Sequence, residues 1–212
     1  INRFLKPLEG YPQIAEVIKE PDQEENIGGT WHTDHSYDQI PAMGSMLYAR
    51  QVPPAGGDTL FSSMTLAFEA LSDGMKKTLL GLNAWHSSRH AFGYGVSDSE
   101  HYEDGRLANP ELAVQDALHP VIITHPLSGK KALYVNADFT VRFDGWTTEE
   151  SQPVLDFLYA HGAREEFTCR FEWQEGSIAL WDNRATWHNA MNDYHGHRRV
   201  MHRITLEGVA LQ

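Results

Sequence analysis

The sequence predicts a mostly β domain in which antiparallel strands close into a sandwich or jelly roll and helices flank the sheets. Many short runs of strand-forming residues are bounded by Gly, Pro, Asn and Asp, whereas only two segments have clear helical periodicity. The 212 residues, 41% of them hydrophobic, suffice for one core. No internal repeat or low-complexity linker divides the chain, so we expect residues 1–212 to form a single domain.

Strand and helix signals alternate in the first half of the chain. Residues that favour β-strands run from Gly44 to Arg50, and a Pro- and Gly-rich turn at 52–58 separates them from a second such run at Thr59–Phe61. This pattern predicts two strands joined by a tight connection. Apolar residues recur at helical spacing between Thr65 and Leu82, which indicates one helix packed on a sheet. The segment from His86 to Asn109 has no apolar period, and we expect a long loop or lid.

The second half contains better-marked boundaries. Strand-like runs at Ala117–Thr124 and Lys131–Asn136 flank a turn containing Pro and Gly, which predicts a hairpin. Thr147 and Glu150 form a capping-box pattern that opens a helix, and His161-Gly162 marks its end. Three further strands are expected at Phe167–Gln174, Ser177–Asp182 and Arg199–Glu207.

Composition restricts the partners and the compartment. The formal charge of −12, from 29 acidic and 17 basic residues, argues against binding to nucleic acid or to an anionic membrane. Cys169 is the single cysteine, so a disulfide framework is excluded and a reducing, cytoplasmic location is expected, with this thiol in the core. No apolar run is long enough to span a membrane. Because the sequence opens without Met, we expect a missing N-terminal segment.

Candidate metal ligands occur near both ends of the chain. His32 and Asp34 stand at i and i+2, and on an extended segment such side chains project from one face. His188, across several intervening strands, is the candidate third ligand. Two histidines and a carboxylate bind one face of an octahedral iron and leave three positions for a cosubstrate and oxygen. The same set also suits catalytic zinc.

A strand near the C-terminus carries candidate anion-binding residues. Strand alternation from Arg198 to Leu206 places Arg199 and Arg203 on the same face. A buried guanidinium requires an acidic partner or a ligand carboxylate, whose geometry its planar fork matches. Surface ion pairing in an acidic protein is the alternative. Because both arginines follow His188 closely, a carboxylate-bearing cosubstrate beside the metal is a reasonable hypothesis.

The ordered motifs resemble the taurine dioxygenase (TauD/TfdA) family of Fe(II)- and 2-oxoglutarate-dependent dioxygenases. The resemblance runs from about Trp31 to Leu206. Its motifs are Trp31-His32-Thr33-Asp34, Gly56-Gly57-Asp58-Thr59-Leu60, His119-Pro120-Val121, Ala132-Leu133-Tyr134-Val135-Asn136, Phe139-Thr140, Trp181 to His188, and Arg198 to Arg203. It implies a cupin-like double-stranded β-helix, the jelly roll already expected.

The resemblance also implies a ligand set and a reaction. His32, Asp34 and His188 would bind Fe(II), and Arg199 and Thr59 would hold the far carboxylate of 2-oxoglutarate. With O2, such an enzyme hydroxylates its substrate and releases succinate and CO2. Hydroxylation at a carbon that bears a heteroatom would cleave the product.

Substrate recognition is the part of the family pattern that this chain does not fully match. By resemblance, Arg203 would engage an anionic group of the substrate and Phe139 would line its pocket. A small sulfonate, carboxylate or aryloxy acid is therefore the expected substrate. Gly28, where taurine dioxygenase carries Asn, argues against taurine itself. The resemblance also implies that the protein forms a homo-oligomer.

Two other functional classes remain open from the sequence. A zinc-dependent hydrolase using the same three ligands would work without oxygen or 2-oxoglutarate. A metal-free jelly-roll module would use Arg203 and Phe139 only to bind an anion and would have no turnover.

Overall fold

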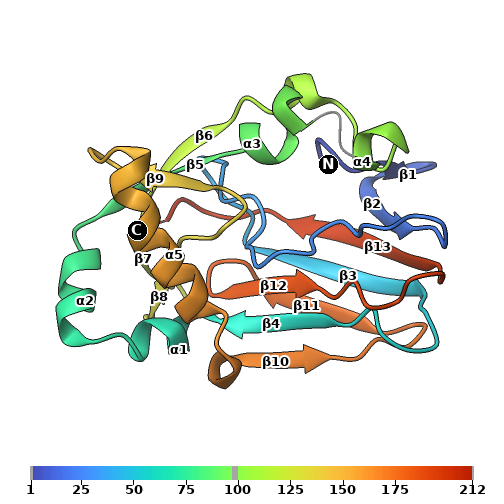
Figure 1. The fold of residues 1–212 in the computed structure, drawn as a ribbon. Helices are drawn as coiled ribbons and strands as arrows, with labels where there is room; N and C mark the ends of the chain where they lie inside the picture. The colour runs from blue at the N-terminus through green and yellow to red at the C-terminus, as the bar shows by residue number, and fades with distance from the viewer. Residues whose placement is uncertain (1, 97–99, 212) are drawn as a thin grey trace.

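The computed structural model describes residues 2–96 and 100–211, and it is mostly β, as predicted (Figure 1). Strands in this part of the chain form sheets with the orders β1-β2-β13-β3-β11, β10-β4-β12, β6-β5-β9 and β7-β8. The strands are β1 Pro7–Leu8, β2 Tyr11–Lys19, β3 Gly44–Gln51, β4 Thr59–Ser63, β5 Asn83–Ser87, β6 Asp116–Pro120, β7 Ile122–Thr124, β8 Lys131–Leu133, β9 Thr140–Phe143, β10 Thr168–Phe171, β11 Ile178–Asp182, β12 Thr186–Ala190 and β13 Arg199–Leu206.

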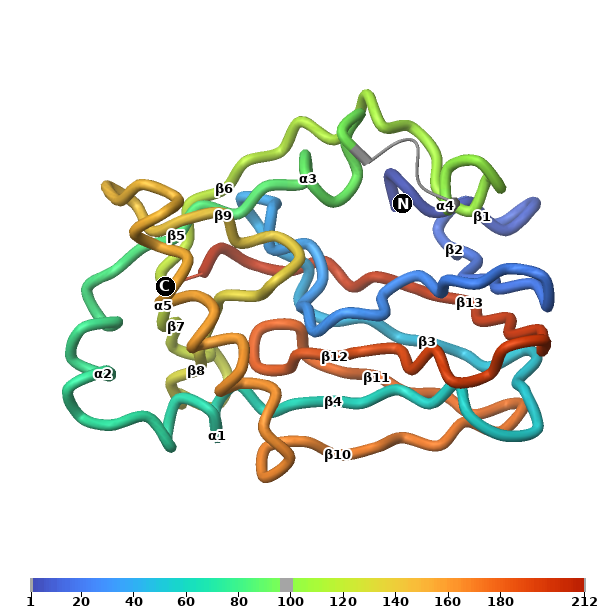
Figure 2. The backbone as a smooth tube through the Cα atoms, in the orientation of Figure 1, coloured from blue at the N-terminus to red at the C-terminus, as the bar shows by residue number. Residues whose placement is uncertain are grey.

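Two antiparallel sheets face each other and make the jelly roll that the sequence predicts. The β1-β2-β13-β3-β11 sheet lies against the β10-β4-β12 sheet, and the chain runs repeatedly between them (Figures 1 and 2). Buried apolar side chains fill the space between the sheets, among them Leu47 on β3, Trp181 on β11 and Met201 on β13. Alternate residues of each strand face this core, because successive side chains of a strand point to opposite faces.

The turn at 52–58 connects β3 and β4 as predicted, but the two strands do not pair. β3 pairs with β13 and β11, whereas β4 pairs with β10 and β12. The turn therefore carries the chain from one sheet to the other, and Gly56 and Gly57 within it have positive φ values of 77° and 71°. By contrast, β7 and β8 form an antiparallel hairpin at the predicted turn. The strand expected over Ala117–Thr124 is divided, however, since β6 pairs with β5 and only β7 pairs with β8.

The three longer of the described helices lie at one end of the sandwich, and the two shortest lie over its top (Figure 1). The helices are α1 Met64–Glu69, α2 Asp73–Leu79, α3 Arg89–Phe92, α4 Glu100–Glu103 and α5 Thr148–Gly162, with short 3-10 turns at Tyr94–Val96, Pro110–Leu112 and Glu165–Phe167. The single helix expected over Thr65–Leu82 is wrong, since Ser72 breaks it and caps α2 by accepting from the Met75 amide. The capping box of Thr147 and Glu150 is confirmed at the start of α5.

The expected loop over His86–Asn109 is also only partly right. Its first residues belong to β5, and α3, a 3-10 turn and α4 follow, while residues 97–99 lie outside the described residues. Periodicity missed these elements because each is only one turn long or a strand end. The segment runs over the top of the sandwich in Figure 1.

The expectation that Cys169 lies in the core is wrong. The residue is exposed because β10 is an edge strand, and only part of the apolar alternation at Phe167–Gln174 faces the interior. Among the described residues, no helix has the length and apolar character needed to cross a membrane.

Candidate metal and anion site

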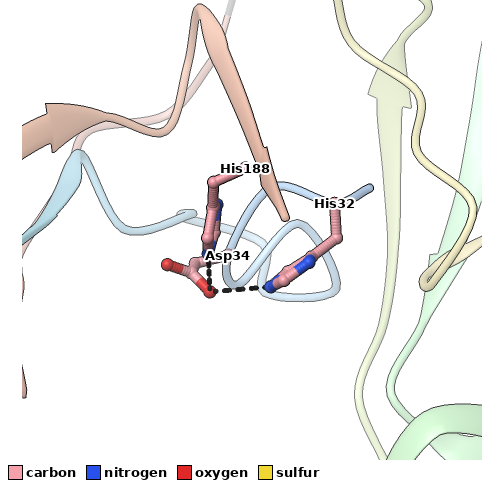
Figure 3. A group of neighbouring side chains, drawn as sticks. All are labelled: His32, Asp34 and His188. Carbon is pink, nitrogen blue, oxygen red and sulfur yellow. Dashed lines mark ion pairs between the residues drawn. The ribbon is translucent and has the colours of Figure 1, made fainter. Parts of the chain in front are cut away.

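Three side chains from two distant parts of the chain converge at one mouth of the sandwich. One ligand atom from each of His32, Asp34 and His188 lies within 4.8 Å of the other two, and all three residues are buried. Asp34 Oδ1 is 3.6 Å from His32 Nε2 and 3.7 Å from His188 Nε2, and the three groups point toward a common centre (Figure 3). This two-histidine, one-carboxylate donor set fits a divalent first-row metal.

The backbone joins the two histidines directly. The His32 amide donates to the His188 carbonyl at 3.1 Å, and the His188 amide donates to the His32 carbonyl at 2.8 Å, as an isolated antiparallel bridge. The extended segment expected around His32 is thus a single bridge residue, and Asp34 already lies in the turn that follows. The bridge places both imidazoles beside that turn.

Hydrogen bonds fix which atoms of the ligands remain free. His32 Nδ1 lies 2.8 Å from the Thr30 carbonyl, which can only accept, so Nδ1 carries a proton and Nε2 is the nitrogen that can bind a metal once it is deprotonated. Asp34 Oδ2 accepts from Ser45 Oγ at 2.7 Å and from Arg203 Nη2 at 2.6 Å. Oδ1 is consequently the oxygen left to face the histidines.

The electrostatics of the three ligands differ. Burial alone would raise the pKa of Asp34, but Arg203 and the two histidines outweigh it and hold this pKa well below its usual value. Burial and the neighbouring His32 lower the pKa of His188. Burial also opposes protonation of His32, yet Asp34 and Asp138 raise its pKa above the ordinary value.

The metal ligands open into a cavity of about 530 Å³ that also contains an anion-binding corner. Arg199 on β13 lines this cavity and is only 5% exposed. Its Nε donates to the Gly57 carbonyl at 2.9 Å, whereas Nη2 is buried and has no hydrogen-bond partner among the described residues. Burial lowers the pKa of Arg199. A desolvated guanidinium with a free donor fits the carboxylate of a ligand.

Thr59, the first residue of β4, lines the same cavity. Its hydroxyl oxygen accepts from Trp173 Nε1 at 3.0 Å, so the hydroxyl hydrogen is available to a ligand oxygen. Arg199 also lies over the Trp173 ring, with 5.8 Å from its guanidinium carbon to the ring centroid. One tryptophan therefore orients both groups that are expected to hold 2-oxoglutarate.

Arg203 and Phe139, the two residues expected at the substrate, line the cavity as well. Arg203 lies against Asp34 and within 3.3 Å of Ser45 Oγ, and its Nε is buried without a partner among the described residues. The Phe139 ring centroid is 6.3 Å from that of His32, at an interplanar angle of 80°. Arg203 is thus both a partner of a metal ligand and a boundary of the cavity.

Sequence reasoning missed several residues that contact the ligands, among them Ser45 and Asp138. Ser45 is fully buried on β3, and its polar side chain at an inward strand position was a usable signal. Asp138 lies between β8 and β9, and its Oδ2 is 3.6 Å from His32 Nδ1. No local pattern distinguishes Asp138, because only the tertiary fold brings this loop to the metal ligands.

Comparison with known proteins identifies the family. The model described as "Taurine catabolism dioxygenase TauD, TfdA family" matches residues 2–205, nearly the whole chain. The chain belongs to the TauD/TfdA family. All seven site residues predicted from the sequence lie within the matched range.

The relatives within the TauD/TfdA family are named as oxygenases or as an alkylsulfatase. An alpha-ketoglutarate-dependent dioxygenase of Penicillium expansum is 39% identical over 178 residues, which cover 82% of this chain and 46% of that protein. The alkylsulfatase of Acinetobacter baylyi is 36% identical over 181 residues, which cover 84% of this chain and 56% of that protein. The chain therefore spans about half the length of these curated relatives.

Solved structures of family members have the same fold. The crystal structure of a taurine dioxygenase from Burkholderia xenovorans superposes with a TM-score of 0.78 at 32% identity, covering 96% of this chain and 67% of that one. This likeness confirms the predicted jelly roll.

Proposed function

We propose that this chain is the catalytic core of an Fe(II)- and 2-oxoglutarate-dependent dioxygenase that hydroxylates a small anionic substrate. One observation carries the proposal: His32, Asp34 and His188 open into the same cavity as the buried, incompletely paired Arg199. A metal triad beside a carboxylate receptor is the arrangement that a metal-chelating 2-oxo acid requires. Membership of the TauD/TfdA family supports it.

In the proposed reaction, a substrate C–H group, O2 and 2-oxoglutarate give the hydroxylated substrate, succinate and CO2. Bound Fe(II) supplies the oxygen-activating chemistry. The protein supplies orientation and excludes water. Arg199 and Thr59 hold the far carboxylate of 2-oxoglutarate, so that its 2-oxo acid end is directed toward the three metal ligands.

Arg203 combines two tasks in this proposal. Its Nη2 holds Asp34 Oδ2, which keeps Oδ1 directed at the metal position. Its unpaired Nε at the cavity boundary is available to an anionic group of the substrate. The names of the relatives, an alkylsulfatase and a taurine dioxygenase, fit substrates with such a group.

The cellular setting remains a further proposal. The single, exposed cysteine and the acidic composition support a cytoplasmic enzyme that acts on small molecules rather than on nucleic acid or membranes. The homo-oligomer expected from the family resemblance can be tested by sedimentation of the purified chain.

Anaerobic titration with Fe(II) and then 2-oxoglutarate tests the proposal. A weak visible charge-transfer band is expected only when both are present, and Arg199→Ala should weaken it. Arg198→Ala is the matched control, because the Arg198 side chain pairs with Glu20 and Gln51 and does not line the cavity. Metal binding without any band would favour the zinc-dependent hydrolase instead.

A further inference from the structure

A second cavity lies along one edge of the sandwich, apart from the cavity that contains the metal ligands, here called the metal cavity. β10 and β11 are each the last strand of their sheet, and no pairing joins them in the described part of the chain. The space between the sheets therefore opens to solvent along these two strands. A groove of about 600 Å³ follows the opening, and we call it the edge groove; its lining includes Phe61, Cys169, Phe171, Ala179, Leu180 and Trp181.

The edge groove is suited to a small apolar ligand. Phe61, Phe171 and Ala179 also pack in the apolar core between the sheets, so the groove continues into that core. Asp182 is the single charged residue in its described lining, and its carboxylate already pairs with Arg184. The groove thus offers no free charge to an ionic ligand, in contrast to the arginine-lined metal cavity.

Trp181 separates the edge groove from the metal cavity. Of the residues that the structure describes, it is the one that lines both spaces. The centroid of its indole lies 4.7 Å from that of the His188 imidazole and 5.3 Å from that of the Phe61 ring. The indole therefore stands between the groove and a metal ligand, and a molecule in the groove has one side chain to pass.

Packing rather than a hydrogen bond holds the Trp181 ring in place. Its Nε1 is buried and has no hydrogen-bond partner among the described residues, whereas Trp173 Nε1 donates to Thr59. A buried indole normally uses its N–H to fix the ring, so Trp181 lacks the restraint that Trp173 has. Phe61 beside it is only half-buried, which leaves the ring room to turn toward the groove.

Two segments that are fastened to each other cover the metal cavity on its other side. The Ala108 amide donates to the Phe4 carbonyl at 2.9 Å, and Leu5 forms an antiparallel bridge with Leu107. Phe4, Leu5 and Leu107 all line the metal cavity. These segments lie above the sandwich in Figure 1, whereas β10 lies at its lower edge. Bound 2-oxoglutarate and substrate would fill the space through which a gas entering from above has to pass.

We propose that O2 enters through the edge groove and that Trp181 gates its passage to the metal position. This inference rests on the proposed function, because only an oxygenase needs such a supply. O2 is small and apolar, so it moves from water into apolar spaces that exclude charged ligands. A separate entrance lets 2-oxoglutarate and substrate stay in place while the gas arrives, and it leaves the stoichiometry of the reaction unchanged.

Xenon, an apolar atom that enters dry protein cavities, tests the edge groove without metal or turnover. Methyl NMR spectra of the metal-free protein are recorded under increasing xenon pressure. We expect the Ala179 methyl signal to shift progressively, because Ala179 lines the groove. Ala132 is the matched control, since it is also buried but packs in a different apolar cluster and lines neither space.

Cys169 allows the edge groove to be plugged, because it is the single cysteine of the chain, is exposed and lines the groove. Benzyl and methyl methanethiosulfonate both form a mixed disulfide with this thiol and release methanesulfinate, so the two products differ only in bulk. Nitric oxide, a diatomic apolar gas, replaces O2, and stopped-flow absorbance measures how fast it binds to protein loaded with Fe(II) and 2-oxoglutarate. We expect the benzyl form to bind it roughly three-fold or more slowly than the methyl form.

Two controls accompany the plug. Cys169→Ser treated with the benzyl reagent should bind nitric oxide at the rate of the untreated protein. The Kd of 2-oxoglutarate should be equal in the benzyl and methyl forms, because the edge groove does not contain the groups proposed to hold it.

Trp181→Phe tests the gate itself. A smaller ring should widen the passage and raise the rate constant for nitric oxide roughly two- to five-fold, and the benzyl plug should abolish this gain. Trp187→Phe is the matched control, because Trp187 is a fully buried tryptophan next to His188 in the sequence but lines neither space.

The outcomes separate the two proposals. An unshifted Ala179 signal under xenon, or equal nitric oxide rates in the benzyl and methyl forms, would overturn the route, while 2-oxoglutarate binding still upheld the dioxygenase. If 2-oxoglutarate failed to bind to the Fe(II)-loaded protein, the proposed function would fall and the route with it. A benzyl form that sedimented as a smaller species than the methyl form would instead identify the groove as an interface between copies of the chain.

Discussion

At the residue scale, the site depends on how the two oxygens of Asp34 are divided. Ser45 and Arg203 occupy Oδ2, which leaves Oδ1 for the position between the histidine nitrogens. The positive charge of Arg203 keeps the Asp34 carboxylate ionised, and the two contacts to Oδ2 fix the orientation of the carboxylate plane. Residues that hold metal ligands in this way affect metal affinity without touching the metal.

Ser45→Ala should therefore weaken metal binding by roughly ten-fold, because it removes a charge-assisted hydrogen bond from a buried carboxylate. Titration with Mn(II) measures the change. Ser62→Ala is the matched control, since Ser62 is equally buried but its hydroxyl donates to the Gly162 carbonyl. Equal loss of affinity in both variants would contradict a specific role for Ser45.

Metal binding should release protons in a pH-dependent way. The pKa of His32 is raised, whereas those of His188 and Asp34 are lowered, so near pH 6.5 His32 is the ligand that carries a proton to be displaced. Affinity should fall as the pH drops through the pKa of His32. Calorimetry in buffers of different ionisation enthalpy should find that proton release per metal rises toward one as the pH falls through the pKa of His32, and declines above it.

Asp138→Asn tests the origin of that behaviour. Removal of this negative charge, 3.6 Å from His32 Nδ1, should lower the pKa of His32 and reduce the proton release at pH 6.5. Release of two protons, or release independent of pH, would contradict the assignment to His32.

At the element scale, the turn between β3 and β4 positions Arg199, the residue proposed to hold the cosubstrate. The Gly57 carbonyl accepts from Arg199 Nε, and the Gly57 amide donates to Asp193 Oδ1 at 2.7 Å. Arg170 pairs with both Asp58 and Asp193, at 2.6 and 3.3 Å. A turn that transfers the chain between sheets is thereby held in the conformation that orients Arg199.

Asp193→Ala should raise the Kd of 2-oxoglutarate by roughly three- to thirty-fold, because it releases the Gly57 amide from its partner. Asp193→Asn retains an oxygen acceptor and loses only an ion pair with the exposed Arg170, so it should bind nearly as well as the parent protein. If Asn were as damaging as Ala, the charge rather than the hydrogen bond would hold the turn.

At the scale of the whole molecule, the site joins parts that fold into different layers. His188 lies on β12 of one sheet, Arg199 on β13 of the other, and His32 on the segment between β2 and β3. Ligands that bind all three should stabilise the folded chain, since the unfolded chain presents no such arrangement.

Fe(II) at about one hundred times its Kd should raise the midpoint of thermal unfolding by roughly 5–10 °C, measured anaerobically. 2-Oxoglutarate should add a further increase, and in Arg199→Ala only this second increase should be lost. A chelator should reverse the first. An unchanged midpoint with bound metal would mean that the unfolded chain binds the metal equally well.

The sequence predicted those features that are encoded locally. The capping box of Thr147 and the hairpin of β7 and β8 depend on neighbouring residues, and both are confirmed. The pairing of β3 and β4 with different sheets, the break at Ser72 and the exposure of Cys169 depend on tertiary contacts that no window of the sequence contains. For the same reason the motifs named the seven candidate site residues, whereas the roles of Ser45 and Asp138 emerged only with the fold.

The backbone bridge between His32 and His188 links metal binding to the completion of folding. It closes a loop that contains most of the chain, and contacts between such distant residues form only after much of the intervening structure has ordered. A nascent or partly folded chain therefore holds His32 and Asp34 without their third ligand. Capture of the iron should accordingly be among the last events of maturation, which protects incomplete chains from carrying a redox-active metal.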